Sequence, residues 1–143
     1  MTDISLKKAR KIIDGALKKA REMNLRPMTF VVVDSGGHLK ALLREDGTPN
    51  LGPDIGLGKA AAAVAMRRTS RELGERFGQN HGLIAALATA REGRFLPIPG
   101  GVLIVDKKNN VLGAAAGTGD TGDNDEVCVI AGVEAAGYKP KLA

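Results

Sequence analysis

Cysteine is nearly absent from this sequence, since Cys128 is the only one in 143 residues. An intrachain disulfide is therefore excluded, and the chain suits a reducing compartment. The valines and isoleucine around Cys128 predict a buried core thiol. Long apolar runs are also missing, and the first residues lack the pattern of a secretory signal. The sequence thus predicts a cytoplasmic protein without a membrane partner.

Aromatic residues make up 3% of the chain, and only two histidines are present. Histidine and cysteine do not occur at the spacings of known metal sites, so we expect no metal ion. Ser35 and Ser70 lack the strand-turn-helix context that exposes a nucleophile, and no catalytic constellation is evident. An enzymatic role is therefore left undecided, with the residues favouring a protein that is not an enzyme.

The net charge of +5 lies in one segment, residues 6 to 24, which has seven basic and two acidic residues. A basic helix can contact nucleic acid or anionic lipid. However, no aromatic residues interleave with these charges, and no nucleic-acid-binding module is recognisable. We expect a solvated helix face and no nucleic-acid partner.

The spacing of apolar residues and of turn residues predicts the element order α-β-β-α-α-α-β-β-β-α. The expected helices cover residues 6–23, 53–68, 70–77, 83–91 and 122–136, and the expected strands cover 28–34, 39–44, 94–98, 102–105 and 111–116. Pro97 and Pro99 restrict the strand at 94–98 to a sheet edge. Because the strands come in antiparallel runs between helices, we predict an α+β fold. The prediction is one domain, residues 1–143, with a five-stranded antiparallel sheet and helices on both faces.

The last predicted strand leads into a glycine-rich junction that contains Gly117, Thr118, Gly119 and Thr121. Backbone N–H groups of such a junction gather at a helix N-terminus, where the helix dipole favours a bound anion. A tight connection to a capped helix explains the same residues without a ligand. The acidic residues that follow lack the pattern of a calcium loop, and helix capping accounts for them more simply.

Lys59 is the only charge in the middle of the alanine-rich helix predicted at 53–68. In apolar surroundings its pKa would fall, and it would serve as a base or as a clamp for an anion. Alternatively, its long side chain carries the ammonium group out to solvent. The alanines of this helix leave little polar surface, which predicts contact with a second subunit.

His38 follows Gly36 and Gly37 in the turn between the first two predicted strands. A turn histidine is commonly just exposed. The alternative is a haem or metal ligand, because neutral imidazole binds iron and side-chain-free backbone lets a flat ligand approach. His81, next to Gly82, carries the same two interpretations, and it is the other candidate haem ligand.

Three stretches together resemble the GlcG/HbpS-type haem-binding or haem-degrading family, which is related to the C-terminal domain of PduO proteins. They are VVVDSGGHLKALLREDG, GKAAAA, and GRFLPIPGGVLIVDKKNNVLGAAAGTG followed by NDEVCVIAG. Two departures stand out. Ala62 replaces the family's usual threonine, and Gly119-Asp120 stands where a second glycine is common. The resemblance implies a profilin-like α-β-α sandwich, assembly into dimers or larger rings, and haem as a possible cofactor.

Three functions follow as hypotheses. The first is a haem-binding or haem-handling module that uses His38. The second is an enzyme or accessory protein that binds a small organic acid through Lys59 and the glycine-rich junction. The third is a homo-oligomeric scaffold without chemistry of its own.

Overall fold

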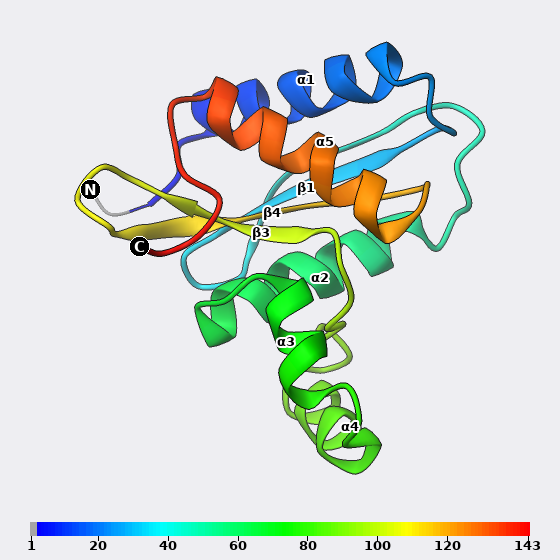
Figure 1. Ribbon diagram of the computed structural model, residues 1–143, viewed down its shortest axis with the longest axis vertical. Coiled ribbons are helices and arrows are strands. Elements are labelled where there is room, and N and C mark those ends of the chain that lie inside the picture. The colour runs from blue at the N-terminus through cyan, green and yellow to red at the C-terminus, as the bar shows by residue number, and fades with distance from the viewer. Residues whose placement is uncertain (1–2) are drawn as a thin grey trace.

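The computed structural model describes residues 3–143 and has one antiparallel sheet with strand order β2-β1-β4-β3. Helices α1 and α5 cover one face of the sheet and α2 covers the other, while α3 and α4 extend away from α2 (Figure 1). The elements are α1 Leu6–Glu22, β1 Thr29–Asp34, β2 Leu39–Arg44, α2 Gly52–Met66, α3 Ser70–Phe77, α4 His81–Ala90, β3 Gly101–Val105, β4 Val111–Thr118 and α5 Gly122–Ala135. The predicted α+β class is confirmed.

The face covered by α1 and α5 has a core that combines large apolar side chains such as Phe30 and Ile12 with several alanines. The amphipathic α1 begins after Ser5, whose hydroxyl accepts from the Lys8 backbone N–H at 3.2 Å. Gly132 of α5 lies directly on α1, because a Cβ there would stand 2.2 Å from the Ile12 carbonyl oxygen. Close backbone approach of this kind lets two helices pack without large side chains.

On the opposite face, α2 is buried against the chain's own sheet. Its alanines at 60 to 63 are at most 1% exposed, and Gly56 lies against Val31 of β1. The expectation that the alanines of this helix contact a second subunit is therefore wrong for residues 60 to 63, whereas Ala65 and Met66 at the end of α2 are exposed. The buried alanines are covered by β1, β3, β4 and α3 of the same chain.

The predicted fifth strand at 94–98 does not form, so the sheet has four strands rather than five. Instead the segment crosses α2, and the Leu96 backbone N–H donates to the Gly58 carbonyl at 3.1 Å. Pro97 and Pro99 have no N–H to give to a strand ladder. The outer edge of β3 is partly filled by the C-terminal segment, where Val105 and Lys139 exchange two backbone hydrogen bonds of 2.9 Å.

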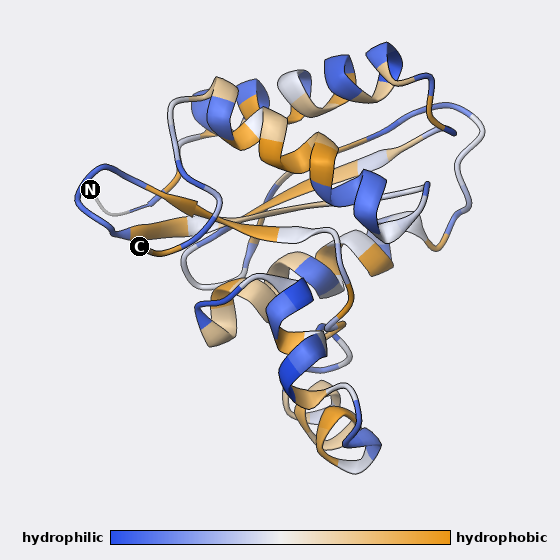
Figure 2. Cartoon of the chain, in the orientation of Figure 1, coloured by the Kyte–Doolittle hydropathy of each residue, from blue (hydrophilic) through white to orange (hydrophobic). Residues whose placement is uncertain are grey.

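Helix α4 differs from the other helices because none of its residues is buried. It begins at residue 81, two residues before the predicted start, since the Asn80 side chain accepts from the Leu83 N–H and caps it. Figure 2 shows that α4 is mainly apolar, although it protrudes from the rest of the chain. Among residues 3–143, no helix combines the length and the hydropathy that crossing a bilayer requires.

Candidate functional site

The turn between β1 and β2 is organised by the carboxylate of Asp34. Its Oδ1 accepts the backbone N–H of Gly36 at 3.0 Å and that of His38 at 2.9 Å. The fourth residue of the turn, Gly37, has φ 83°, in the left-handed region that glycine adopts without strain. Burial raises the pKa of Asp34, but the hydrogen bonds from His38 and Gly36 outweigh it and hold the pKa below its usual value. The turn therefore keeps this carboxyl group ionised.

The same carboxylate also sets the orientation of the His38 imidazole. Nδ1 of His38 lies 3.1 Å from Asp34 Oδ1. An ionised carboxylate can only accept, so Nδ1 carries the proton and donates it. In the neutral ring, Nε2 then keeps its lone pair, on a side chain that is 77% exposed. This arrangement presents a ligating nitrogen to solvent in a fixed tautomer.

Two neighbouring glycines leave room for two planar side-chain groups against the turn. A Cβ on Gly36 would stand 2.8 Å from Cε1 of His38. A Cβ on Gly37 would stand 2.5 Å from Nη2 of Arg91, which ends α4. The turn thus carries an imidazole on one glycine and a guanidinium on the next.

Lys59 is enclosed at the other end of the sheet and does not reach solvent. Its Nζ donates to the Gly117 carbonyl at 2.9 Å and to Asp125 Oδ2 at 3.2 Å, and both side chains of this ion pair are at most 3% exposed. The pair joins α2 to α5 across the end of the sheet. Gly100 permits the crossing, since a Cβ there would lie 2.6 Å from Nζ. Burial lowers the pKa of Lys59 against the opposing pull of Asp125.

Of the glycine-rich junction, Gly117 contacts Lys59 through its carbonyl. Gly119 instead lies against Pro27 and Met28, and Thr121 caps α5. The chain's own acids already accept from two backbone N–H groups just before α5. Asp125 Oδ1 accepts from the Asp120 N–H at 2.9 Å, and Asp120 Oδ2 accepts from the Thr121 N–H at 2.9 Å. Hydrogen bonds from Asn124, Thr121 and Arg26 lower the pKa of Asp120 to about 2. Among residues 3–143, no three metal-ligating side chains gather in one place.

The two groups of predicted site residues lie at opposite ends of the sheet. β1 and β4 pair so that Asp34 faces Gly113 and Thr29 faces Thr118, which separates His38 from the Lys59 pair by roughly 17 Å along the strands. His81 is the exposed first residue of α4. It stands about 15 Å from the Arg91 end of that helix, so it does not meet His38 within one chain.

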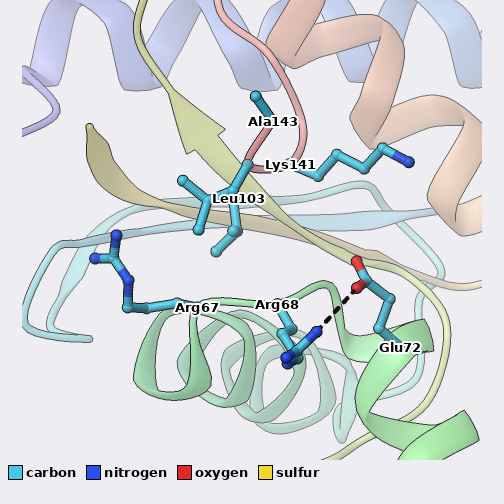
Figure 3. A pocket seen from close by; sticks show the side chains of 7 residues that line it. Arg67, Arg68, Glu72, Leu103, Lys141 and Ala143 are labelled. Atoms are coloured by element: carbon cyan, nitrogen blue, oxygen red, sulfur yellow. Dashed lines mark ion pairs between the residues drawn. The ribbon is translucent and has the colours of Figure 1, made fainter. Parts of the chain in front are cut away.

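A cationic pocket of about 310 Å³ lies at the C-terminal end of α2. Its charged lining consists of Arg67, Arg68, Lys141 and Glu72, around Leu103 (Figure 3). Arg68 stands 3.8 Å from Glu72, whereas Arg67 and Lys141 point in other directions. Because its cations diverge, the pocket lacks the convergent donors of a site for one small anion.

The family model described as "Haem degrading protein HbpS-like" matches residues 4–134. The chain belongs to this HbpS-like family. The resemblance seen in the sequence is thereby confirmed.

Individual relatives extend this assignment. An uncharacterised 15.0 kDa protein of Citrobacter freundii, from the dhaT-dhaS intergenic region, is 31% identical over 87% of this chain and 85% of its own length. A crystal structure of a double mutant of Streptomyces reticuli HbpS has a TM-score of 0.78 and 27% identity, covering 94% of this chain and 87% of that one. A PduOC–haem complex has a TM-score of 0.86 and 18% identity, covering 98% and 99%, and this likeness concerns the fold alone.

Three residues of these sites escaped the sequence analysis. Asp34 precedes His38 by four positions in a glycine-containing turn. This spacing is a signal of an Asx-type turn, in which the fifth residue contacts the aspartate carboxylate. Asp125 was one of several acids at a helix start, and nothing local marks it as the partner of Lys59. Arg91 reaches the turn only because of how α4 packs, so the sequence holds no signal for it.

Proposed function

We propose that this HbpS-like protein binds haem, with Nε2 of His38 as the axial ligand of the iron. One observation carries the proposal: the 3.1 Å contact between His38 Nδ1 and Asp34 Oδ1, which leaves Nε2 as the free ring nitrogen. Histidines that bind metals usually donate their second N–H to a carboxylate or carbonyl, which orients the ring and raises its basicity. Asp34 is therefore the positioning residue for the ligand.

The surroundings of His38 fit a flat, partly apolar group. Gly36 lets the His38 ring lie close to the turn backbone, and Gly37 leaves space for the guanidinium of Arg91. The next residue, Leu39, is 55% exposed at the start of the edge strand β2, and it offers apolar surface to a porphyrin. Bound haem would supply a redox-active iron. The protein's own part is to hold the imidazole in the orientation that turns Nε2 towards the iron.

An absorbance titration with haem tests this proposal, using the wild type, His38→Ala and His81→Ala. We expect a saturable Soret band in the wild type and in His81→Ala, and only a weak, unsaturable change in His38→Ala. His81 serves as the matched control because it is the other exposed histidine. A saturable band of equal affinity in all three proteins would contradict the assignment of His38.

We also propose that the protein forms a homo-oligomer, at least a dimer, through α4. This helix consists mostly of alanine, leucine and isoleucine, and none of its residues is buried within the chain. A helix of that composition is stable when another surface covers it. Light scattering checks this proposal: Leu83→Glu, at a side chain that is 37% exposed, should lower the mass. A monomeric wild type at micromolar concentration would refute it.

A cytoplasmic location is part of the same proposal. Cys128 is buried, and burial together with Asp125 and Asp120 raises the pKa of its thiol to about 11. A thiol in that state is unreactive, so the single cysteine serves packing rather than redox chemistry. Fractionation of cells that express the chain would test the location.

A further inference from the structure

Arg91 joins the protruding helix α4 to the turn that carries His38. It follows the last residue of α4, and its backbone N–H donates to the Leu87 carbonyl at 3.1 Å. Leu87 packs beside a small apolar cluster of Ala62, Leu73 and Phe95, which fixes this end of α4 against α2. From there the Arg91 side chain extends to Gly37, with Val64 of α2 beside the same glycine.

The guanidinium of Arg91 lacks the carboxylate partners that Arg71 and Arg21 have. Arg71 pairs with Glu126 at 3.2 Å, and Arg21 pairs with Glu45 at 3.1 Å. Over the described range 3–143, Arg91 takes part in no ion pair, and its Nε is buried without an acceptor. A buried N–H without an acceptor costs free energy, and in native proteins it calls for an explanation such as a missing ligand.

The position of Arg91 relative to His38 restricts what that ligand is. The two side chains lie against consecutive glycines, so imidazole and guanidinium are at most roughly 12 Å apart. A guanidinium presents a planar fork of donors that matches a carboxylate. A ligand that fills both positions carries a metal at one point and a carboxylate within about that distance. Haem fits this description through its iron and its two propionates.

We propose that Arg91 anchors a propionate of the haem whose iron His38 binds, so that α4 contributes to the site. This inference rests on the proposed function, and it adds the residue that selects a porphyrin bearing free carboxylates. It also explains why an otherwise poorly packed helix is held against the turn at this end.

The test compares haem with haem dimethyl ester, in which both propionates are esterified while the ring and iron stay the same. Each is titrated into the wild type, Arg91→Gln and Arg94→Gln in the same solvent. Arg94 is the matched control, since its 43% exposed side chain already lies 3.7 Å from Glu92. We expect the wild type and Arg94→Gln to bind haem about tenfold or more tightly than the ester, because charged hydrogen bonds are lost with the ester. Arg91→Gln should bind both porphyrins with the weaker affinity.

The outcomes separate this inference from the proposed function. If Arg91→Gln still prefers haem over the ester as strongly as the wild type, another residue holds the propionate and the inference is overturned. If no saturable band forms in the wild type, the proposed function itself fails. If Arg91→Gln does not fold, Arg91→Lys replaces it, because lysine keeps the charge but lacks the planar guanidinium. The wild type alone also tests the inference, since equal affinity for haem and its ester would overturn it.

Discussion

The two hairpin turns of this protein are built in the same way, but only one of them carries an imidazole. The first is residues 34–38 and the second is residues 106–110. In the second, Asp106 Oδ1 accepts the backbone N–H of Lys108 at 2.9 Å and that of Asn110 at 2.8 Å. Asp34 accepts from the same relative positions in the first turn. The fourth residue has a positive φ in both, 83° at Gly37 and 66° at Asn109.

The turns differ at the fifth residue. Asn110 Nδ2 returns to Asp106 Oδ2 at 3.0 Å, where His38 Nδ1 returns to Asp34 Oδ1 at 3.1 Å. Asparagine therefore closes the turn as well as histidine does. We therefore propose that His38 is needed for what its second nitrogen binds rather than for closing the turn. The aspartate and the positive-φ residue thus form the turn in both hairpins, and the imidazole is the feature that only the first turn has.

The largest expected effect comes from His38→Asn, which makes the first turn like the second. Asparagine can renew the bond to Asp34 but offers no imidazole nitrogen, so saturable haem binding should disappear. The free energy of unfolding should change by only about 0.5 kcal/mol, as for most surface substitutions. Haem titration and urea unfolding measure the two quantities. Unchanged haem binding in His38→Asn would contradict the proposal that the imidazole binds the iron.

The next effect comes from replacing each turn's aspartate by asparagine. Asp34→Asn and Asp106→Asn both keep an oxygen for the backbone N–H groups and lose the charge. Only Asp34→Asn should weaken haem binding, by about tenfold, since loss of an outer carboxylate lowers metal affinity by that order. Haem titration of both variants measures this. Equal affinities would show that the carboxylate serves the turn alone.

A smaller effect is expected from alanine at the fourth position of each turn. Gly37→Ala should cost about 1–2 kcal/mol, because alanine is strained at positive φ and its Cβ would meet Arg91 at 2.5 Å. Asn109→Ala should cost less. Asparagine at φ 66° is itself somewhat strained, so replacing it by alanine adds less strain than replacing a glycine does. Urea unfolding compares the two losses. A larger loss at Asn109 would contradict the role given to Arg91 beside Gly37.

The smallest effect is on acid stability, and the two turns should contribute alike. Burial raises the pKa of Asp34 but hydrogen bonds from His38 and Gly36 outweigh it, and hydrogen bonds from Asn110 lower that of Asp106. A lowered folded pKa adds stability above the ordinary value of 3.8, and this is lost as the pH falls through the folded pKa. Urea unfolding from pH 5 to pH 3 should therefore decline less steeply in either asparagine variant. An unchanged slope in both would contradict these directions.

Much of the fold follows from local sequence signals. The Gly36-Gly37 pair and the polar residues 106–110 predict both hairpins, and apolar spacing predicts every helix within a few residues. The strand predicted at 94–98 does not form, because Pro97 within it and Pro99 just after it have no N–H to donate. In addition, Gly58 of α2 offers its carbonyl to the Leu96 N–H. That choice depends on tertiary contact, which no local pattern reveals.

The sites were less predictable than the fold. The sequence singled out His38 and Lys59, but it could not decide between burial and exposure for Lys59, since its partner Asp125 lies far along the chain. Whether a long side chain reaches solvent depends on packing around it, here on Gly100 and Gly117. Arg91 was missed for the same reason: its position is a consequence of how α4 docks.

Resonance Raman spectroscopy of the ferrous haem-loaded protein tests the central claim most directly, because it detects the iron–histidine bond itself. We expect an iron–histidine stretching band in the wild type and its loss in His38→Asn. In Asp34→Asn the band should persist at a lower frequency, since a neutral partner makes the imidazole a weaker donor. Identical spectra for the wild type, His38→Asn and Asp34→Asn would contradict the account.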